Sequence, residues 1–255
     1  MANRLLYPRN SATRRVLPMD GMWNFKFDYN NEGDIQNWKN GLKDATTIPV
    51  PASFNDFFVD KDAREFAGDV WYETKLYVPS EWADMDLDIR FDAATHFATV
   101  YVNGEEVAKH KGGFLPFNAN INKVVKFDTE NTVVVKINNE LSRETLPVGK
   151  TITLENGKKM VKPYFDFFNY AGLQRSVRLV ATPKESIVDF TVNHHLMGED
   201  AKVDYIVETT GENEVYITVY DEDRKQVATA KGKEGSILIE NARLWNVLDA
   251  YLYTF

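Results

Sequence analysis

The sequence predicts an all-β protein built from β sandwiches, the first of them of the jelly-roll type. Three observations support this prediction. Short stretches in which apolar and polar residues alternate recur along the chain. Turn residues separate these stretches at regular intervals, and helical periodicity is rare. The 255 residues, 44% of them hydrophobic, are enough for two domains with cores of their own.

The first half of the chain contains the clearest strand patterns. The alternation predicts strands at residues 22–28, 73–78, 87–91, 98–102, 105–108, 131–137 and 176–180. Asn103-Gly104 stands between two of them. A type I′ turn needs positive φ at both central residues, and Asn-Gly adopts it readily, so we expect a tight hairpin there.

A domain boundary is expected at Thr182-Pro183-Lys184, a short polar segment. Residues 1–184 carry equal numbers of acidic and basic side chains, so residues 185–255 hold the whole net charge of −8. Strands are expected after the boundary at 187–192, 203–207, 215–219, 227–230 and 237–239. The predicted domains are therefore residues 1–183 and 184–255.

The composition argues against several classes of protein. Neither part of the chain has the basic surface of a nucleic-acid-binding protein. No apolar run approaches the ~20 residues of a membrane span, and the start of the chain lacks the apolar region of a secretion signal. The chain has no cysteine, which fits a reducing compartment. We therefore expect a cytoplasmic protein with no membrane or nucleic-acid partner.

One stretch stands out for its chemistry. An acid, Asp166, lies between aromatic residues, and Gly172 then lets the backbone turn into the next strand. The aromatic residues beside the acid are Phe165, Phe167, Phe168 and Tyr170. One interpretation is a core aromatic cluster in which Asp166 caps a loop. The other is the wall of a sugar site, because C–H faces of sugars stack on rings while hydroxyls need ionised acceptors.

The same stretch carries a resemblance. Residues 165–172 read Phe-Asp-Phe-Phe-Asn-Tyr-Ala-Gly and are followed by Arg175-Ser176-Val177. This segment resembles the N-terminal sugar-binding domain of the β-glucuronidases, which are family 2 glycoside hydrolases. Residues 51–56, 68–72 and 90–117 are also similar to that family.

The resemblance implies a fold and a site. It implies a jelly-roll, galactose-binding-like sandwich over residues 1–183 and an immunoglobulin-like sandwich over 184–255. The second would be incomplete and C-terminally truncated, because such sandwiches use about seven strands in ~100 residues. An aspartate on the family's loop contacts the substrate above a catalytic barrel, and Asp166 is the matching residue. The four aromatic residues would form its supporting shell.

Other candidate groups do not suggest catalysis. Asn139-Glu140 matches the dipeptide that carries the family's acid/base glutamate, but no Trp-Gly segment precedes it, so we expect no catalytic role for Glu140. His194 and His195 would point to opposite faces of a strand and cannot easily share one metal. We therefore expect no catalytic residue, no metal and no cofactor in this chain.

The predicted function follows from the resemblance. The chain would be an N-terminal, non-catalytic part of a β-glucuronidase, a retaining enzyme that releases β-D-glucuronic acid from glucuronides. Its partners would be a β-glucuronide, bound together with a missing barrel domain, and further subunits of a homo-oligomer. The chain alone would be inactive. The alternatives are a stand-alone carbohydrate-binding module and the same part of a β-galactosidase or β-mannosidase.

Overall fold

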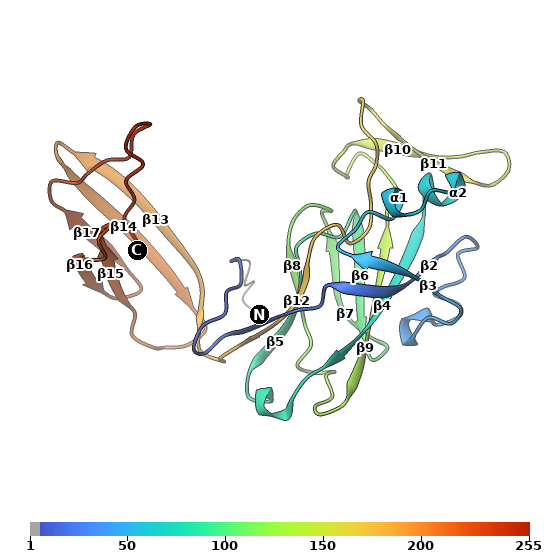
Figure 1. The fold of residues 1–255 in the computed structure, drawn as a ribbon, viewed down its shortest axis with the longest axis horizontal. Coiled ribbons are helices and arrows are strands. Elements are labelled where there is room, and N and C mark those ends of the chain that lie inside the picture. The colour runs from blue at the N-terminus through green and yellow to red at the C-terminus, as the bar shows by residue number, and fades with distance from the viewer. Residues whose placement is uncertain (1–5) are drawn as a thin grey trace. The chain divides into compact units, whose positions relative to one another are not determined.

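The computed structural model of the protein describes residues 6–255, which form two compact units. One unit spans Tyr7–Pro183, and the other contains Lys184–Phe255 (Figure 1). In both, nearly all regular structure is β, as the alternating patterns predict. No helix in the described part of the chain is long and apolar enough to cross a membrane.

The first unit is a sandwich of two antiparallel sheets. The larger sheet has the order β3 (Thr46–Val50), β2 (Gly21–Phe27), β4 (Asp69–Tyr77), β9 (Glu130–Asn138), β6 (Phe97–Val102), β7 (Glu105–Lys111). The smaller sheet has the order β1 (Arg15–Pro18), β12 (Val177–Thr182), β5 (Asp86–Phe91), β8 (Phe117–Asn120). The first and last strands of the unit are neighbours in the smaller sheet, because β1 pairs with β12.

The core of this unit lies between the two sheets. Phe25, Tyr72 and Val135 contribute from the larger sheet, and Ile89 and Leu179 contribute from the smaller one; all are fully buried. Each such side chain contributes about 1.5–3 kcal/mol by leaving water. This packing makes the sandwich a rigid base for the loops that leave its ends.

The Asn103-Gly104 hairpin between β6 and β7 is confirmed. Asn103 has φ of 53° and Gly104 has φ of 83°, the positive values that the turn requires. The Asn103 side chain also donates to the carbonyl oxygen of Val124 at 2.9 Å and to Oδ1 of Asn131 at 2.8 Å. The turn residue thereby ties the hairpin to a neighbouring loop.

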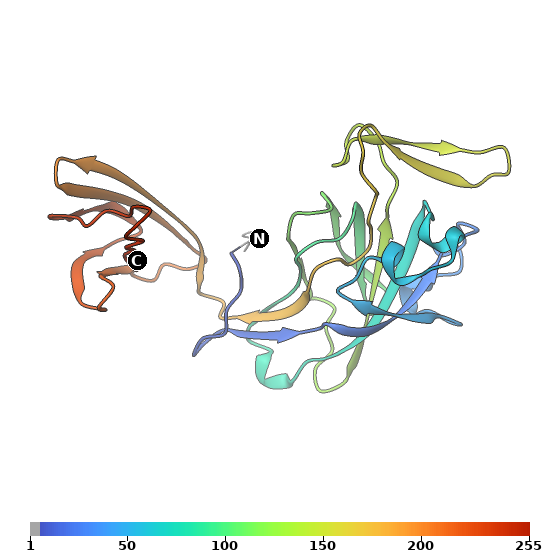
Figure 2. The ribbon, with the colours of Figure 1, turned by 45° about the horizontal axis from the view of Figure 1, so that its top comes forward.

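Several short elements lie outside the two sheets of the sandwich. They are η1 (Trp38–Asn40), α1 (Phe54–Phe57), α2 (Lys61–Arg64), η2 (Ser80–Trp82) and a separate hairpin of β10 (Gly149–Thr153) and β11 (Lys159–Pro163). Asp60 caps α2 by accepting from the backbone N–H groups of Asp62 and Ala63. The β10–β11 hairpin projects from the sandwich near α1 and α2 (Figure 2), and Lys158 at its tip pairs with Asp62 at 2.7 Å.

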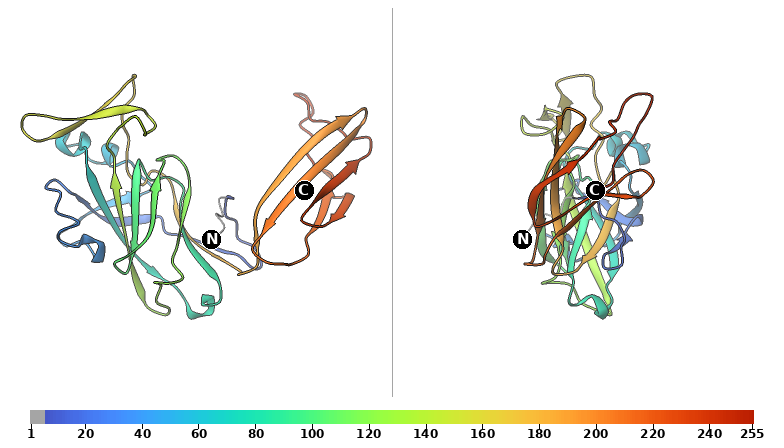
Figure 3. Two further views of the ribbon diagram at one scale, coloured as in Figure 1. Left: turned by 180° about the vertical axis from the view of Figure 1, so that it is seen from behind. Right: turned by 90° about the vertical axis from the view of Figure 1, so that its left-hand side faces the viewer.

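The second unit packs a three-stranded sheet against a two-stranded one (Figure 3). The first has the order β13 (Ile187–Met197), β14 (Asp200–Thr209), β17 (Glu234–Ile239), and the second pairs β15 (Tyr216–Tyr220) with β16 (Gln226–Lys231). Their core contains Val203, Tyr205, Val219 and Ile237. Thr254 forms a further bridge to Tyr220 beside β15.

Candidate functional site

The aromatic stretch forms a loop between β11 and β12. It leaves the hairpin after Pro163 and rejoins the sandwich at Gly172, where an isolated bridge pairs Gly172 with Thr95. Residues at the C-terminal end of this loop are held by buried hydrogen bonds, whereas residues 164–168 are exposed. We call residues 169–172 the root of the loop and residues 164–168 its tip.

A buried asparagine holds the root from one side. Asn169 is 4% exposed, and its Nδ2 donates to the carbonyl oxygen of Asn139 at 2.9 Å. Its Oδ1 therefore accepts, and Nε2 of His96 donates to it at 2.7 Å. Asn139 is itself fixed, because its side chain accepts from the Gly68 N–H and donates to the Phe66 carbonyl oxygen.

His96 is neutral in this arrangement. Burial lowers the pKa of its imidazole, and the hydrogen bond to Asn169 offsets that effect only in part. Nδ1 of His96 is buried and has no hydrogen-bond partner among the described residues 6–255. A proton on Nδ1 would therefore be a buried charge without a partner, which is costly.

A second buried asparagine holds the root from the other side. Oδ1 of Asn55 accepts from the Ala171 N–H at 2.8 Å, and its Nδ2 donates to the carbonyl oxygen of Arg64 at 2.7 Å. Gly172 follows with φ of 113°, and a Cβ there would lie 2.4 Å from Oη of Tyr72. Only glycine fits this position, so the root is fixed by backbone shape as well as by hydrogen bonds.

The tip of the loop is exposed. Tyr164, Phe165, Phe167 and Phe168 are 37–58% exposed, Tyr170 beside them is 37% exposed, and Asp166 is also exposed. The Asp166 carboxylate makes no hydrogen bond or ion pair within the part of the chain that the structure describes. Exposed neighbouring rings of this kind mark surfaces that bind something.

The rings contact one another without enclosing the acid. Phe168 and Tyr170 have centroids 4.9 Å apart, and Phe165 and Phe167 have centroids 5.9 Å apart. The guanidinium of Arg64 lies 5.3 Å from the centre of the Phe168 ring. Asp166 is therefore neither a buried acid nor a cap of its own loop, and its carboxylate is available to a ligand.

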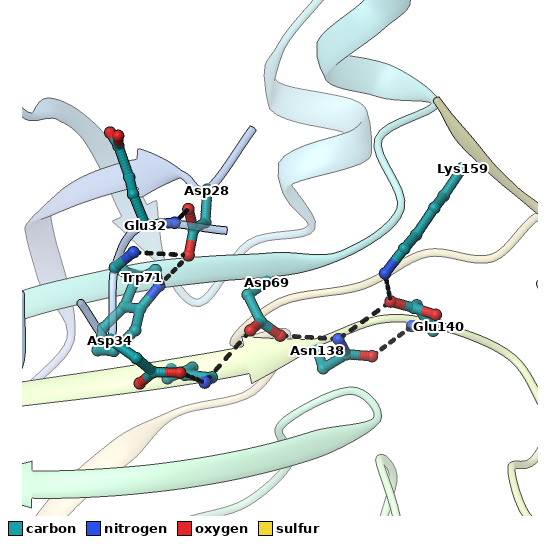
Figure 4. A network of polar contacts seen from close by, with 10 residues as sticks. Asp28, Glu32, Asp34, Asp69, Trp71, Asn138, Glu140 and Lys159 are labelled. Atoms are coloured by element: carbon teal, nitrogen blue, oxygen red, sulfur yellow. Dashed lines mark hydrogen bonds and ion pairs between the residues drawn. The ribbon is translucent and has the colours of Figure 1, made fainter. Parts of the chain in front are cut away.

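Glu140 lies outside the loop, in a polar network across β4, β9 and β11 (Figure 4). Its carboxylate pairs with Nζ of Lys159 at 2.5 Å, and its backbone N–H donates to Oδ1 of Asn138 at 2.9 Å. Nδ2 of Asn138 donates in turn to Asp69 at 2.7 Å. These contacts give Glu140 a part in joining the β10–β11 hairpin to the sandwich.

The same network continues along the outer surface of β4 and β9 (Figure 4). Lys136 lies between Asp69 at 3.3 Å and Asp34 at 2.5 Å. Burial alone would lower the pKa of Lys136, but the two carboxylates outweigh it and leave the pKa raised. Asp28 accepts from the backbone N–H groups of Glu32 and Gly33. Asp28, Asp34 and Asp69 therefore each have a hydrogen-bond or ion-pair partner within the protein.

The histidines do not form a metal site with their neighbours. His194 and His195 are consecutive on β13 and lie opposite Val203 and Lys202 of β14. In residues 6–255 no group of three or more His, Cys, Asp or Glu side chains is placed to hold a metal ion.

The sequence pattern located the loop but missed what holds it. Asn55, His96 and Asn169 were not singled out, because a lone polar residue in an apolar stretch does not reveal its partner. Each of the three stands next to an apolar residue in the sequence. This position could have identified them, because a buried polar side chain must be hydrogen-bonded.

Known proteins resemble the chain along its length. Residues 16–183 match the family profile described as "Glycosyl hydrolases family 2, sugar binding domain". Among curated relatives, a beta-glucuronidase of Paenibacillus borealis is 44% identical over 257 residues, which cover 98% of this chain and 43% of the relative. A beta-glucuronidase of Streptococcus agalactiae is 38% identical and shares 98% of this chain and 42% of its own length.

Solved structures of beta-glucuronidases are also similar to this chain. The beta-glucuronidase of Lactobacillus rhamnosus has a TM-score of 0.94 at 54% identity, covering 98% of this chain and 42% of that one. That of Ruminococcus gnavus in complex with D-glucuronic acid has a TM-score of 0.94 at 49% identity, covering 99% of this chain and 44% of that one. The chain thus spans less than half the length of the proteins it matches. From the family match over residues 16–183, the chain belongs to glycosyl hydrolase family 2 and carries the sugar binding domain of that family.

Proposed function

We propose that the chain is the N-terminal, non-catalytic part of a β-glucuronidase, an enzyme that releases β-D-glucuronic acid from glucuronides with retention. The observation that carries the proposal is the loop at residues 164–172. It presents a free carboxylate and exposed rings on a root that is fixed by buried hydrogen bonds. Likeness over 98% of the chain to proteins named beta-glucuronidase supports the same function.

In this proposal the loop contributes to substrate binding. The Asp166 carboxylate accepts hydrogen bonds from sugar hydroxyls, and Phe165, Phe167, Phe168 and Tyr170 surround that contact once a catalytic domain covers them. A rigid root is useful because a carboxylate positions substrate well only if its own place is fixed. The loop does no bond chemistry.

The catalytic carboxylates come from elsewhere in the enzyme. Retaining glycosidases use two carboxyl groups about 5–5.5 Å apart, one as acid/base and one as nucleophile. Glu140, Asp69 and Asp34 are held in ion pairs with lysines, and Asp166 serves substrate binding in this proposal. Residues 6–255 contain sandwiches and no (β/α)₈ barrel. A barrel of ~250 residues would supply the catalytic pair.

The proposal also covers the domains of the chain, the oligomeric state of the enzyme and its cellular compartment. Residues 1–183 form the jelly-roll sugar-binding domain, and residues 184–255 belong to an immunoglobulin-like domain whose remaining strands lie in the rest of the enzyme. The enzyme is a homo-oligomer. It works in the cytoplasm, which the absence of cysteine supports.

A second candidate function is carbohydrate binding by the chain alone. The exposed rings of the tip and the family's description as a sugar binding domain favour it. Calorimetry with D-glucuronate would detect it. Binding in the low-millimolar range or tighter by the 255-residue chain would support a binding module, and its abolition by Asp166→Ala would place the site on the loop.

A chromogenic β-glucuronide separates these functions. The 255-residue chain is expected to show no turnover, whereas a longer protein in which this chain precedes a family 2 barrel is expected to turn over the substrate. Turnover by the short chain that survives repurification would contradict the assignment of catalysis to a barrel. An inactive but folded longer protein would contradict the glucuronidase assignment.

A further inference from the structure

Asn169 ties the exposed tip of the loop to the sandwich. It stands three residues after Asp166, and three residues span at most about 11 Å. Both ends of its amide are used, because Nδ2 donates to the carbonyl oxygen of Asn139 at 2.9 Å and Oδ1 accepts from Nε2 of His96 at 2.7 Å. The orientation of this side chain is therefore fixed only while both partners are present.

The donor on His96 stands on a backbone that is itself held. The His96 N–H donates to the carbonyl oxygen of Asn138 at 2.9 Å, and the Thr95 N–H donates to that of Gly172 at 3.2 Å. The Thr95 hydroxyl donates to the carbonyl oxygen of Gly113 at 3.1 Å. These bonds join residues 95 and 96 to the end of β9 and to the root, so Nε2 of His96 has a fixed place from which to donate.

Packing closes over the ring of His96. The residue is 2% exposed, and the ring of Phe114 meets it edge-on with the two centroids 6.1 Å apart. A Cβ on Gly113 would lie 3.0 Å from Nδ1 of His96, so the backbone there is packed against the imidazole. His96 therefore does not face a ligand, and any part that it has in binding is exerted through Asn169.

The histidine costs stability as well as adding to it. Nδ1 of His96 is buried without a hydrogen-bond partner among residues 6–255, and such an atom lowers the stability of the fold. Replacing both partners of a buried hydrogen bond by apolar side chains of the same shape is often neutral for stability. The pair of His96 and Asn169 is therefore better explained by the place that it gives to the loop.

We propose that His96 is a positioning residue for substrate binding, whose Nε2–H holds Asn169 and thereby fixes where the Asp166 carboxylate stands. This inference rests on the role of Asp166 in the proposed function. The bond between Asn55 and Ala171, at 2.8 Å, holds the root independently. Loss of the bond from His96 should therefore loosen the tip without detaching the whole loop.

A double-mutant cycle tests whether His96 acts through Asp166. It uses a protein that joins this chain to a family 2 barrel and measures kcat/KM for a chromogenic β-glucuronide per folded molecule. His96→Leu should lower kcat/KM by about 3- to 30-fold, less than Asp166→Ala, because it displaces the carboxylate without removing it. In the Asp166→Ala background the same change should lower kcat/KM by less than about twofold, since the group that it positions is gone. Asn169→Ala, which removes the acceptor, takes the place of His96→Leu should that variant fail to fold.

His96→Gln is the conservative variant. The amide nitrogen of glutamine is as many bonds from Cα as Nε2 of histidine, so it still donates to Oδ1 of Asn169. This variant should keep kcat/KM within about threefold of the parent. His110→Leu is the matched control, because His110 is a half-buried histidine of the same sandwich and its Nε2 donates to the carbonyl oxygen of Gly112 at 3.0 Å. It should keep kcat/KM within about twofold.

Hydrogen exchange of the 255-residue chain tests the inference without catalysis. The amides of residues 169–172 should exchange at least about tenfold faster in His96→Leu than in the parent, because a bond that opposes local opening of the root is lost. In His96→Gln and in His110→Leu the same amides should exchange at close to the parent rate.

Three results would overturn the inference. One is a folded His96→Leu variant that keeps the kcat/KM of the parent while Asp166→Ala loses it, and the proposed function would then stand alone. Another is an equal loss from His96→Leu in the parent and in the Asp166→Ala background, which would give His96 a purely structural role. The third is unchanged exchange of residues 169–172 in His96→Leu. An Asp166→Ala variant without any loss would instead overturn the proposed role of the loop, and this inference with it.

Discussion

Gly172 is the residue on which the backbone of the root depends. Gly172→Ala combines a left-handed backbone with a Cβ only 2.4 Å from Tyr72 Oη, so it should lower the free energy of unfolding by about 2–5 kcal/mol. Gly157→Ala is the control, because Gly157 has φ of 82° but no atom within 4 Å of its added Cβ. It should cost only about 1–2 kcal/mol. Urea unfolding measures both, and equal losses would show that the contact with Tyr72 is unimportant.

His96 makes the stability of the protein depend on pH. Because burial lowers its pKa in the folded state, the unfolded chain binds a proton more readily. Stability is therefore fully present above the unfolded pKa of about 6.5, and it is lost as the pH falls from there toward the lower folded pKa. Each pH unit in that window should cost up to about 1.4 kcal/mol.

Chemical unfolding at pH 7.5 and at about pH 5.5 checks this dependence. His96→Gln should flatten it, whereas His110→Gln, at a half-buried histidine outside the root, should leave most of it. If His96→Gln retains the full loss of stability at the lower pH, another group is responsible.

Residue types alone predicted part of the site. Asp166 and its four aromatic neighbours were placed on one loop, because the glycine and the following strand pattern marked its end. Their exposure argues against the first of the two interpretations, because a core aromatic cluster would be buried. The contacts of Asn169 with His96 and of Asn55 with Ala171 join residues far apart in the chain, and spacing within one stretch cannot show them.

At the scale of elements, strands with one buried face were predicted well. The alternation at 131–137 lies within β9 (Glu130–Asn138), and the Asn-Gly turn fixed the β6–β7 hairpin. β13 was predicted to end at 192 but continues to Met197, because Asn193, His194 and His195 interrupt the alternation. The β10–β11 hairpin was not predicted, because apolar and polar residues do not alternate regularly in its sequence.

The β10–β11 hairpin is joined to the sandwich through Glu140, and this gives a prediction. Glu140→Gln removes an ion pair with Lys159 that is about a third exposed, so it should lower stability by no more than about 1 kcal/mol. In a longer, barrel-containing protein it should leave kcat unchanged. Glu105→Gln, at an exposed residue of β7, is the control. A loss of kcat by several orders of magnitude, with the fold intact, would instead make Glu140 catalytic.

At the scale of the molecule, the fold class followed from the sequence because each strand carried its own pattern. The family followed from one long motif, residues 165–172 with Arg175-Ser176-Val177, and from the match over residues 16–183. What an exposed loop contacts in a longer protein cannot be deduced from its own residues, because the partner surface lies outside them. The central claim is therefore that the loop tip contacts the substrate.

The most direct test is Asp166→Ala in a protein that joins this chain to a family 2 barrel. A charge-assisted hydrogen bond contributes roughly 1.5–3 kcal/mol, so kcat/KM for a β-glucuronide should fall by about 10- to 150-fold. Asp166→Asn should lose less, because the amide oxygen still accepts. Since Asp166 is exposed and makes no hydrogen bond or ion pair within residues 6–255, both variants should melt within about 1 °C of the parent. An unchanged kcat/KM in fully folded Asp166→Ala would contradict the account.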